Sequence, residues 1–153
     1  MGTEPEREKC RLTELKGPEA TIDFILRMKS IVVVGCSPNP ARAGHYVPAY
    51  MQEQGYRIIP VNPGHDRLLG EKCYPSLSAV PGPVEVVNVF RNPDFVPPII
   101  EEAIKVKAKA IWLQDGVTSP EAEEKARQAG LLVVSDDCIL RRHRARRLKY
   151  RVI

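Results

Sequence analysis

One stretch of the chain combines the residue types that hold phosphate without a metal ion. Residues 35–45 read Gly-Cys-Ser-Pro-Asn-Pro-Ala-Arg-Ala-Gly-His. Gly35 would let the backbone approach a ligand closely, and Gly44 permits a tight entry into a helix. Ser37 offers a hydroxyl and Arg42 a forked cation. A helix that begins after such a loop presents unpaired N–H groups and the positive end of its dipole. The stretch therefore predicts a phosphate cradle, with an ordinary strand-to-helix connection as the alternative.

Two better-known phosphate motifs are absent from the sequence. The chain contains no Gly-Lys-Ser/Thr triplet, which argues against a nucleoside triphosphatase P-loop. The glycine spacing does not give the three-glycine dinucleotide fingerprint either. A nicotinamide-dinucleotide site usually carries an acid near the end of its second strand. Here that strand ends in Val-Asn-Pro-Gly at 61–64, so the sequence does not favour such a cofactor.

The apolar pattern predicts the elements that position this stretch. Four consecutive β-branched residues, 31–34, indicate a strand buried on both faces. Further strands are predicted at 56–61, 84–90, 109–113 and 131–135, with a short extended piece at 72–74. Helices are predicted at 18–28 and 44–54, from 94, from 119 to 130, and from 138. Helix-length connections favour parallel pairing with right-handed crossovers. We therefore expect a doubly wound, Rossmann-like α/β fold, with a five-stranded parallel sheet and helices on both faces.

Capping signals predict where individual helices begin and end. Pro48 is expected in the first turn of its helix, where the missing N–H costs little. Gly55 is expected to close that helix in a left-handed conformation. Ser76 is predicted to cap a single helical turn at 76–80, and Asp94 to cap the helix after the third strand.

Ligands of open α/β sheets bind outside the carboxyl ends of the strands, where the strand order reverses. This rule selects five segments of the chain. They are residues 35–44, 62–63, 90–91, 114–117 and 136–138. We expect these segments to converge on one edge of the sheet.

Length and composition indicate one globular domain. The chain has 153 residues, of which 43% are hydrophobic and 27% charged. No apolar run approaches the roughly 18 residues of a membrane span, and the polar N-terminus does not resemble a signal peptide. Cysteines at 10, 36, 73 and 138 lack CxxC spacing, so we expect reduced thiols in a cytoplasm and no metal site. The expected division is a flexible arm at 1–17, a ligand-binding domain at 18–140 and a basic tail at 141–153.

The basic tail raises the question of partners. Seven arginines and lysines lie between 141 and 151 without an acid among them. They could contact nucleic acid, a ligand phosphate or an acidic surface. No aromatic platform or recognition-helix pattern accompanies them, which favours a solvated final helix over nucleic-acid binding. Whether the chain forms a homodimer is left open.

Five short motifs, taken in order, resemble those of a known family. They are Val-Val-Gly-Cys-Ser-Pro-Asn-Pro at 33–40, Pro-Val-Asn-Pro at 60–63, Val-Phe-Arg at 89–91, Trp-Leu-Gln-Asp-Gly-Val at 112–117 and Asp-Asp-Cys at 136–138. The set is similar to the CoA-binding domain family, small stand-alone proteins that share a fold with the CoA-binding part of the succinyl-CoA synthetase α-subunit. The resemblance spans about residues 20–140, and Cys36 replaces the alanine that is commonest at its position.

The resemblance implies that coenzyme A or an acyl-CoA binds across the sheet edge. Loop 35–44 would take the pyrophosphate, residues 61–63 the adenosine side, and the segment after the fourth strand the pantetheine arm. Phe90, Arg91 and the start of the helix that follows them would flank the nucleotide or the pantetheine. The implied binding residues are Gly35, Cys36, Ser37, Pro38, Arg42, Gly44, His45, Val61, Asn62, Pro63, Phe90, Arg91, Gln114, Gly116, Val117 and Cys138. Cys138 would lie near the ligand thiol.

Four functional hypotheses remain open at this stage. The chain lacks a recognisable nucleophile–base–acid set, so a CoA-binding module without catalytic residues is favoured over an enzyme. A redox protein could instead form a mixed disulfide with CoA through Cys138 or Cys36, if a helix N-terminus lowers the thiol pKa. The chain could also be the CoA-binding subunit of a partner-dependent acyl-CoA synthetase, which only the fold supports. A DNA-binding regulator is supported by the basic tail alone.

Overall fold

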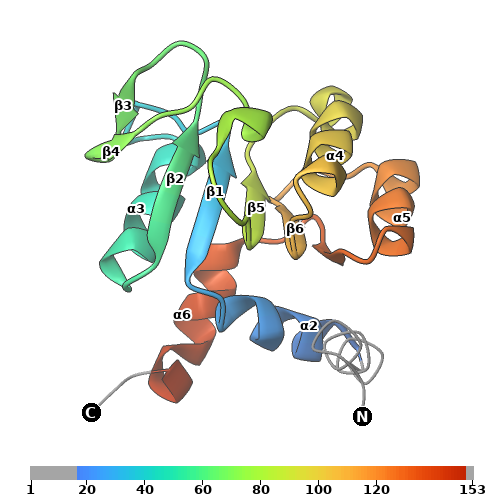
Figure 1. The fold of residues 1–153 in the computed structure, drawn as a ribbon. Coiled ribbons are helices and arrows are strands. Elements are labelled where there is room, and N and C mark those ends of the chain that lie inside the picture. Colours follow the sequence, from blue (N-terminus) through green and yellow to red (C-terminus); the bar gives the residue numbers. More distant parts are fainter. Residues whose placement is uncertain (1–16, 151–153) are drawn as a thin grey trace.

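Five parallel strands form the centre of the fold. The computed structural model describes residues 17–150. Its main sheet contains β1 (Ser30–Val34), β2 (Arg57–Val61), β5 (Val86–Val89), β6 (Ala110–Leu113) and β7 (Leu132–Val134). Their order is β2-β1-β5-β6-β7, and every neighbouring pair is parallel (Figure 1). The predicted doubly wound α/β fold is confirmed. The arm expected at 1–17 lies outside the described residues except for Gly17.

Helices cover both faces of this sheet. They are α2 (Gly17–Leu26), α3 (Ala43–Glu53), α4 (Val96–Lys105), α5 (Pro120–Gln128) and α6 (Ile139–Tyr150). Successive side chains of a strand point to opposite faces. In β1, Val32 and Val34 join the buried cluster formed with α4 and α5, whereas Ile31 and Val33 join the cluster formed with α2, α3 and α6. The sheet is therefore the middle of three layers. Among the described residues, no helix combines the length and apolarity needed to span a bilayer.

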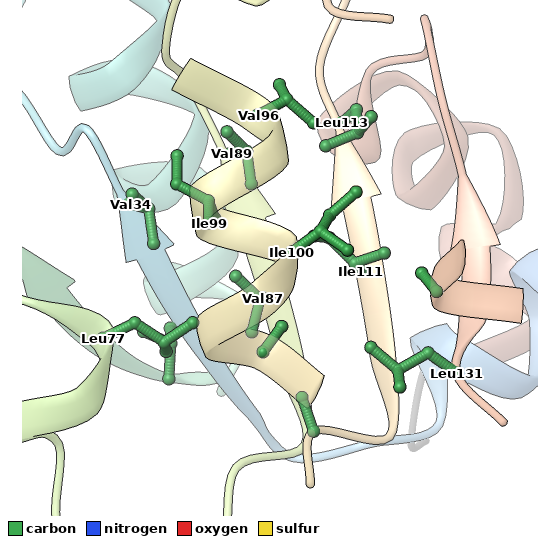
Figure 2. Packing of buried hydrophobic residues seen from close by; sticks show 14 of the residues in the cluster. Val34, Leu77, Val87, Val89, Val96, Ile99, Ile100, Ile111, Leu113 and Leu131 are labelled. Atoms are coloured by element: carbon green, nitrogen blue, oxygen red, sulfur yellow. The ribbon is translucent and has the colours of Figure 1, made fainter. Parts of the chain in front are cut away.

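Helix α4 fixes one wall of the crevice at the sheet edge. Its buried residues are Val96, Ile99, Ile100 and Ala103. Figure 2 shows α4 lying over the strands, with Ile100 close to Val87 and Ile111 in the same apolar cluster. These apolar contacts hold α4 on the sheet. The loop between β5 and α4 is therefore anchored at both ends.

The start of α4 differs from the prediction that Asp94 is its cap. A short 3-10 helix, η2 (Pro93–Phe95), precedes α4. The side chain of Asn92 accepts a hydrogen bond from the Asp94 N–H at 3.0 Å. Asp94 is thus the residue that donates to the cap, because the helical path begins two residues earlier than expected.

The predicted cap at Ser76 is also wrong in its chemistry. Ser76 precedes the 3-10 helix η1 (Leu77–Ala79), but its side chain makes no capping hydrogen bond. Glu102 of α4 instead accepts hydrogen bonds from the N–H and the hydroxyl of Ser78, each at 3.0 Å. A contact across the fold replaces the local cap and joins η1 to α4.

A small hairpin returns the chain to the sheet edge after β2. It consists of β3 (Arg67–Leu68) and β4 (Glu71–Lys72), which pair antiparallel. The sequence predicted only an extended piece at 72–74. Tyr74 then forms a parallel bridge with Val61, the last residue of β2. This bridge places the following residues beside the carboxyl end of β2.

Arginines of the predicted basic tail join α6 to α2. Residues 141–150 are helical in α6. Arg142 pairs with Glu19 at 3.2 Å, and Arg146 pairs with Asp23 at 2.9 Å and also with Glu19. Figure 1 shows α2 and α6 side by side below the sheet. Part of the positive charge of this segment is therefore matched by acids on the same molecule.

Helix α6 also packs on α3 through a buried imidazole. His143 is 4% exposed, and its Nδ1 lies 2.9 Å from the Tyr50 hydroxyl. The rings of Tyr50 and Tyr56 meet it edge-on, with centroids at 5.5 and 5.7 Å. Burial lowers the pKa of His143 below its ordinary value of 6.5. The folded protein thus disfavours the charged imidazole.

We predict that the free energy of unfolding decreases as the pH falls through the ordinary histidine range. The unfolded chain takes up a proton on His143 more readily than the folded chain, so acidification favours unfolding. Urea unfolding at about pH 8 and pH 5.5 measures the effect. The His143→Gln variant should lose less stability than the wild type over the same interval, and equal losses would contradict the prediction.

Candidate functional site

A cavity of about 910 Å³ opens at the carboxyl ends of the strands. Fourteen of the sixteen residues implied from the sequence line it. They are Gly35, Cys36, Ser37, Pro38, Arg42, Gly44, Val61, Asn62, Pro63, Phe90, Arg91, Gln114, Val117 and Cys138. His45 and Gly116 do not line it. The predicted segments therefore meet at one edge, although they come from five different parts of the chain.

Glycine is required at two positions of the loop between β1 and α3. Gly35 has φ +87°, and a Cβ added there would lie 2.8 Å from the Phe90 carbonyl oxygen. A Cβ added at Gly44 would lie 2.8 Å from the Gly35 carbonyl oxygen. The backbones after β1 and β5 and at the start of α3 are thus in direct contact. A larger residue at either position would separate the walls of the cavity.

Proline at position 48 helps to close this loop. Pro48 is the sixth residue of α3 and so lies beyond the first turn in which the sequence placed it. It has no N–H to donate to the carbonyl of Gly44, four residues earlier. The Ser37 N–H donates to that carbonyl instead, at 3.0 Å. Because Pro48 leaves the Gly44 carbonyl free, this carbonyl can bind the Ser37 N–H and hold the loop against α3.

Polar side chains fix the rest of the loop. The Ser37 hydroxyl accepts from the Asn39 N–H at 3.1 Å, and the Asn39 side chain accepts from the Ala41 N–H at 3.0 Å. Asn62, after β2, donates to the Cys36 carbonyl at 2.9 Å. His45 Nδ1 lies 2.8 Å from the Ser37 carbonyl, so its ring supports the loop from outside the cavity.

The start of α3 leaves donors for an anion. Arg42 is the N-cap residue, and its side chain makes no capping hydrogen bond. Within residues 17–150, the N–H groups of Ala43 and Gly44 have no acceptor. Such amides and the positive end of the helix dipole attract phosphate. This geometry has the form of the predicted cradle.

The cations of the cavity lie at its open side. Arg42 is exposed, and Arg91 is half-buried with its guanidinium 4.3 Å from the centre of the Phe95 ring. Phe95 and Tyr46 are 47% and 49% exposed and also line the cavity. Within the described part of the chain, neither arginine forms an ion pair with an acid.

The acids in the lining are already engaged. Asp115 receives two hydrogen bonds from Arg141, at 2.9 and 3.0 Å, and the Arg141 guanidinium lowers the Asp115 pKa below its ordinary value. Glu102 is held by Ser78, as described above. The negative charges are thus neutralised or hydrogen-bonded, whereas the two arginines remain available to a ligand.

The closed end of the cavity carries neutral polar groups. Gln114 is 5% exposed and Cys138 is 9% exposed. Cys138 directly precedes α6, and its carbonyl accepts the first hydrogen bond of that helix from the Arg142 N–H, at 3.1 Å. Gln114 Oε1 accepts from the Ile139 N–H, so the two cavity residues are held by the same turn.

The thiol of Cys36 does not have the lowered pKa on which its redox role depended. Cys36 is 1% exposed, and burial raises its pKa to about 12. At neutral pH it is a neutral thiol. Burial also raises the pKa of Cys73. Burial of the Cys36 side chain therefore argues against the reactive thiolate that the mixed-disulfide alternative needs at this position.

Part of the cavity lining lies outside the residues expected from the sequence. These additional lining residues include Tyr46, Pro75, Ser76, Leu77, Phe95, Pro98, Ile99 and Glu102. Leu77 belongs to η1, and Pro98, Ile99 and Glu102 belong to α4, whose start was expected beside the ligand. The hairpin and the Tyr74 bridge bring η1 to the site, and no local signal predicts that contact.

Comparison with known proteins agrees with this geometry. The profile described as "CoA binding domain" matches residues 29–144. The chain belongs to the CoA binding domain family. Its match to this family covers the whole β2-β1-β5-β6-β7 sheet and all five segments at the cavity.

Relatives of this CoA binding domain protein include both small proteins and larger ligases. It is 41% identical to the uncharacterized protein YneT of Bacillus subtilis over 117 residues, which cover 76% of this chain and 87% of YneT. A hypothetical protein from Pyrococcus horikoshii has 38% identity and a TM-score of 0.80, covering 86% of this chain and 94% of that one. The alpha subunit of an ADP-forming acetate–CoA ligase from Pyrococcus furiosus is 26% identical, covering 77% of this chain but 28% of the subunit.

We predict that Gly44→Ala destabilises the protein by about 1–3 kcal/mol, the usual range for overpacking. The added Cβ would lie 2.8 Å from a backbone oxygen that cannot rotate away. Gly64→Ala is the control, since its Cβ would lie 3.4 Å from the Asn62 side chain. Urea unfolding measures both variants. An effect of Gly44→Ala no larger than that of Gly64→Ala would show that the two backbones can separate freely.

Proposed function

We propose that this CoA binding domain protein binds coenzyme A, free or acylated, as a stand-alone module without catalytic machinery of its own. The observation that carries the proposal is the polarity of the cavity. Free donors and two arginines that reach solvent lie in its lining, together with the buried, uncharged side chains of Gln114 and Cys138. CoA has the same distribution, with a diphosphate in its middle and a neutral arm ending in a thiol.

In this proposal the loop at 35–44 holds the diphosphate. The amides of Ala43 and Gly44 and the guanidinium of Arg42 supply the positive charge. The segment at 61–63 borders the adenosine, and Phe90 with Arg91 flanks the nucleotide or the arm. A volume of about 910 Å³ suits a cofactor-sized ligand.

The arm would follow the ends of β5 and β6 toward the closed end. Gln114 and Val117 border it in this proposal, and Cys138 lies near the thiol. Gly116 supports the turn from outside, since its N–H donates to Asp136 Oδ1 at 2.7 Å. Within residues 17–150 the lining contains thiols and carboxylates but no histidine. This composition suits binding better than acid–base catalysis.

The alternative of a ligase subunit is supported by the acetate–CoA ligase relatives. The chain spans 28% of the Pyrococcus furiosus alpha subunit. Ligation would therefore need groups beyond this domain, and the fold alone does not establish where they come from. Copurification of an ATP-grasp chain would favour this alternative over the stand-alone module.

We predict that the wild-type protein binds CoA in preference to NAD, and that Arg42→Ala weakens CoA binding by about 1.5–3 kcal/mol, the range for a hydrogen bond to a charged group. Titration calorimetry measures both quantities. Arg57→Ala is the matched control, because Arg57 is exposed at the opposite, amino end of β2. Preference for NAD would refute the proposal, and unchanged affinity in Arg42→Ala would place the phosphates elsewhere.

The mixed-disulfide alternative is supported by the place of Cys138 in the lining. The Cys138 thiol would attack CoA disulfide, form a Cys138–CoA disulfide and release one CoA thiol. If this reaction occurs, intact-mass analysis after incubation with CoA disulfide should show one adduct in the wild type and in Cys36→Ser, and none in Cys138→Ser. An unshifted wild-type mass would remove the alternative.

A further inference from the structure

The carboxamide of Gln114 is held in one orientation. Its Oε1 accepts two hydrogen bonds, each 3.2 Å long, from Asn88 Nδ2 and from the backbone N–H of Ile139. A backbone N–H can only donate, so the Gln114 atom that it contacts must be the oxygen. The amide of Gln114 therefore cannot be turned over without losing this bond.

Asn88 is fixed in the same way from the other side. It lies in the central strand β5 and is 1% exposed. Its side-chain nitrogen contacts the carbonyl oxygen of Trp112 at 3.2 Å. That oxygen can only accept, so the NH₂ group of Asn88 must serve both Trp112 and Gln114. The carbonyl of Trp112 and the N–H of Ile139 thus determine the direction of the three hydrogen bonds that link these residues through Asn88 and Gln114.

The consequence is a donor without an acceptor. Gln114 Nε2 forms no hydrogen bond with another residue in the described part of the chain, although Gln114 is 95% buried by its 5% exposure. Within the same residues, no fully enclosed side-chain nitrogen or oxygen lacks a partner. Nε2 must therefore reach the open space of the cavity that Gln114 lines. A ligand group that meets it has to be an acceptor.

The position of this donor indicates which part of a ligand it meets. The cations Arg42 and Arg91 and the aromatic ring of Phe95 lie at the open side. Gln114 and Cys138 are the most buried polar residues of the lining apart from Cys36. In the binding mode proposed above, with the phosphates at the arginines, the tip of the neutral arm lies at Gln114. In an acyl-CoA, that tip is a thioester, whose carbonyl oxygen is an acceptor.

We propose that Gln114 determines specificity for the acylated form of the cofactor, by donating Nε2–H to the thioester carbonyl oxygen. Asn88 is the positioning residue behind it. This inference rests on the proposed function, because it assumes that CoA occupies the cavity. It adds that free CoA, which lacks the carbonyl, leaves the Gln114 donor unsatisfied and binds less tightly.

The test compares acetyl-CoA with the S-ethyl thioether of CoA, which has the same two-carbon group without the carbonyl. Calorimetry on the wild type should give acetyl-CoA an affinity about three- to tenfold higher, the value of one hydrogen bond. Gln114→Met should remove this preference, so that acetyl-CoA and the thioether bind with equal affinity. Gln128→Met is the matched control, because Gln128 is exposed on α5.

Asn88→Leu separates positioning from folding. Loss of the Asn88 bond frees the Gln114 carboxamide to turn, so the preference should shrink although Gln114 is still present. The ratio of the two affinities is the readout, since reduced stability alone lowers both affinities together. If the Asn88→Leu variant does not fold, the Gln114→Met variant alone tests whether the preference for acetyl-CoA depends on Gln114.

Each other outcome overturns a stated part of the argument. Equal wild-type affinities for the two ligands would overturn the thioester contact while leaving CoA binding intact. Equal weakening of both ligands by Gln114→Met would place the donor on an amide of the pantetheine arm instead. Failure of the wild type to bind CoA, acetyl-CoA and the thioether would overturn the proposed function itself.

Discussion

The contact between two backbones at the sheet edge is the constraint on which the site depends. Strands β1 and β5 are neighbours, but their loops leave toward opposite faces, one to α3 and the other to α4. The Gly35 and Gly44 positions let these paths touch at distances that a Cβ would forbid. A crevice forms above this contact, because the two loops leave the sheet toward opposite faces. The cavity is thus a result of strand order together with two glycines.

This arrangement leaves the Arg42 side chain of the loop available to a ligand. Pro48 exposes the Gly44 carbonyl to the Ser37 amide, and Asn62 binds the Cys36 carbonyl from the neighbouring strand. Backbone and short polar groups therefore fix the loop. Within residues 17–150 the Arg42 side chain takes no part in holding it, so the guanidinium can turn toward an anion without loosening the structure.

The closed end of the cavity is fixed by a separate set of bonds. Trp112 Nε1 donates to the Asp137 carbonyl at 2.8 Å, and the Asp137 carboxylate receives hydrogen bonds from Arg142, at 2.8 Å, and from Arg141. These contacts hold the turn after β7 against β6. Gln114 follows Trp112 by two residues, and Cys138 directly follows Asp137. The buried part of the lining that contains Gln114 and Cys138 is consequently held by β6 and β7. The part that contains Arg42 and Arg91 follows β1 and β5 instead.

The sequence was sufficient for features that depend on pattern. Continuous apolar runs predicted the five strands, and the rule for α/β sheets predicted which loops would meet. Features that depend on contacts between distant residues could not be predicted. Glu102 replaces the expected Ser76 cap, and the hairpin after β2 brings η1 into the lining. The role of Pro48 also required the structure, because only the fold shows which amide takes the free carbonyl.

The distribution of charge gives the cavity a direction. Burial keeps the Cys36 thiol neutral, and Gln114 adds no charge at the closed end. Asp115 is matched by Arg141, which removes the acid that would otherwise repel an anion nearby. Arg42 and Arg91 are thus the cations that remain for a ligand within the lining. A molecule that carries phosphates on one part and a neutral arm on another can satisfy both ends in only one orientation, because reversing it would bury charge against neutral groups.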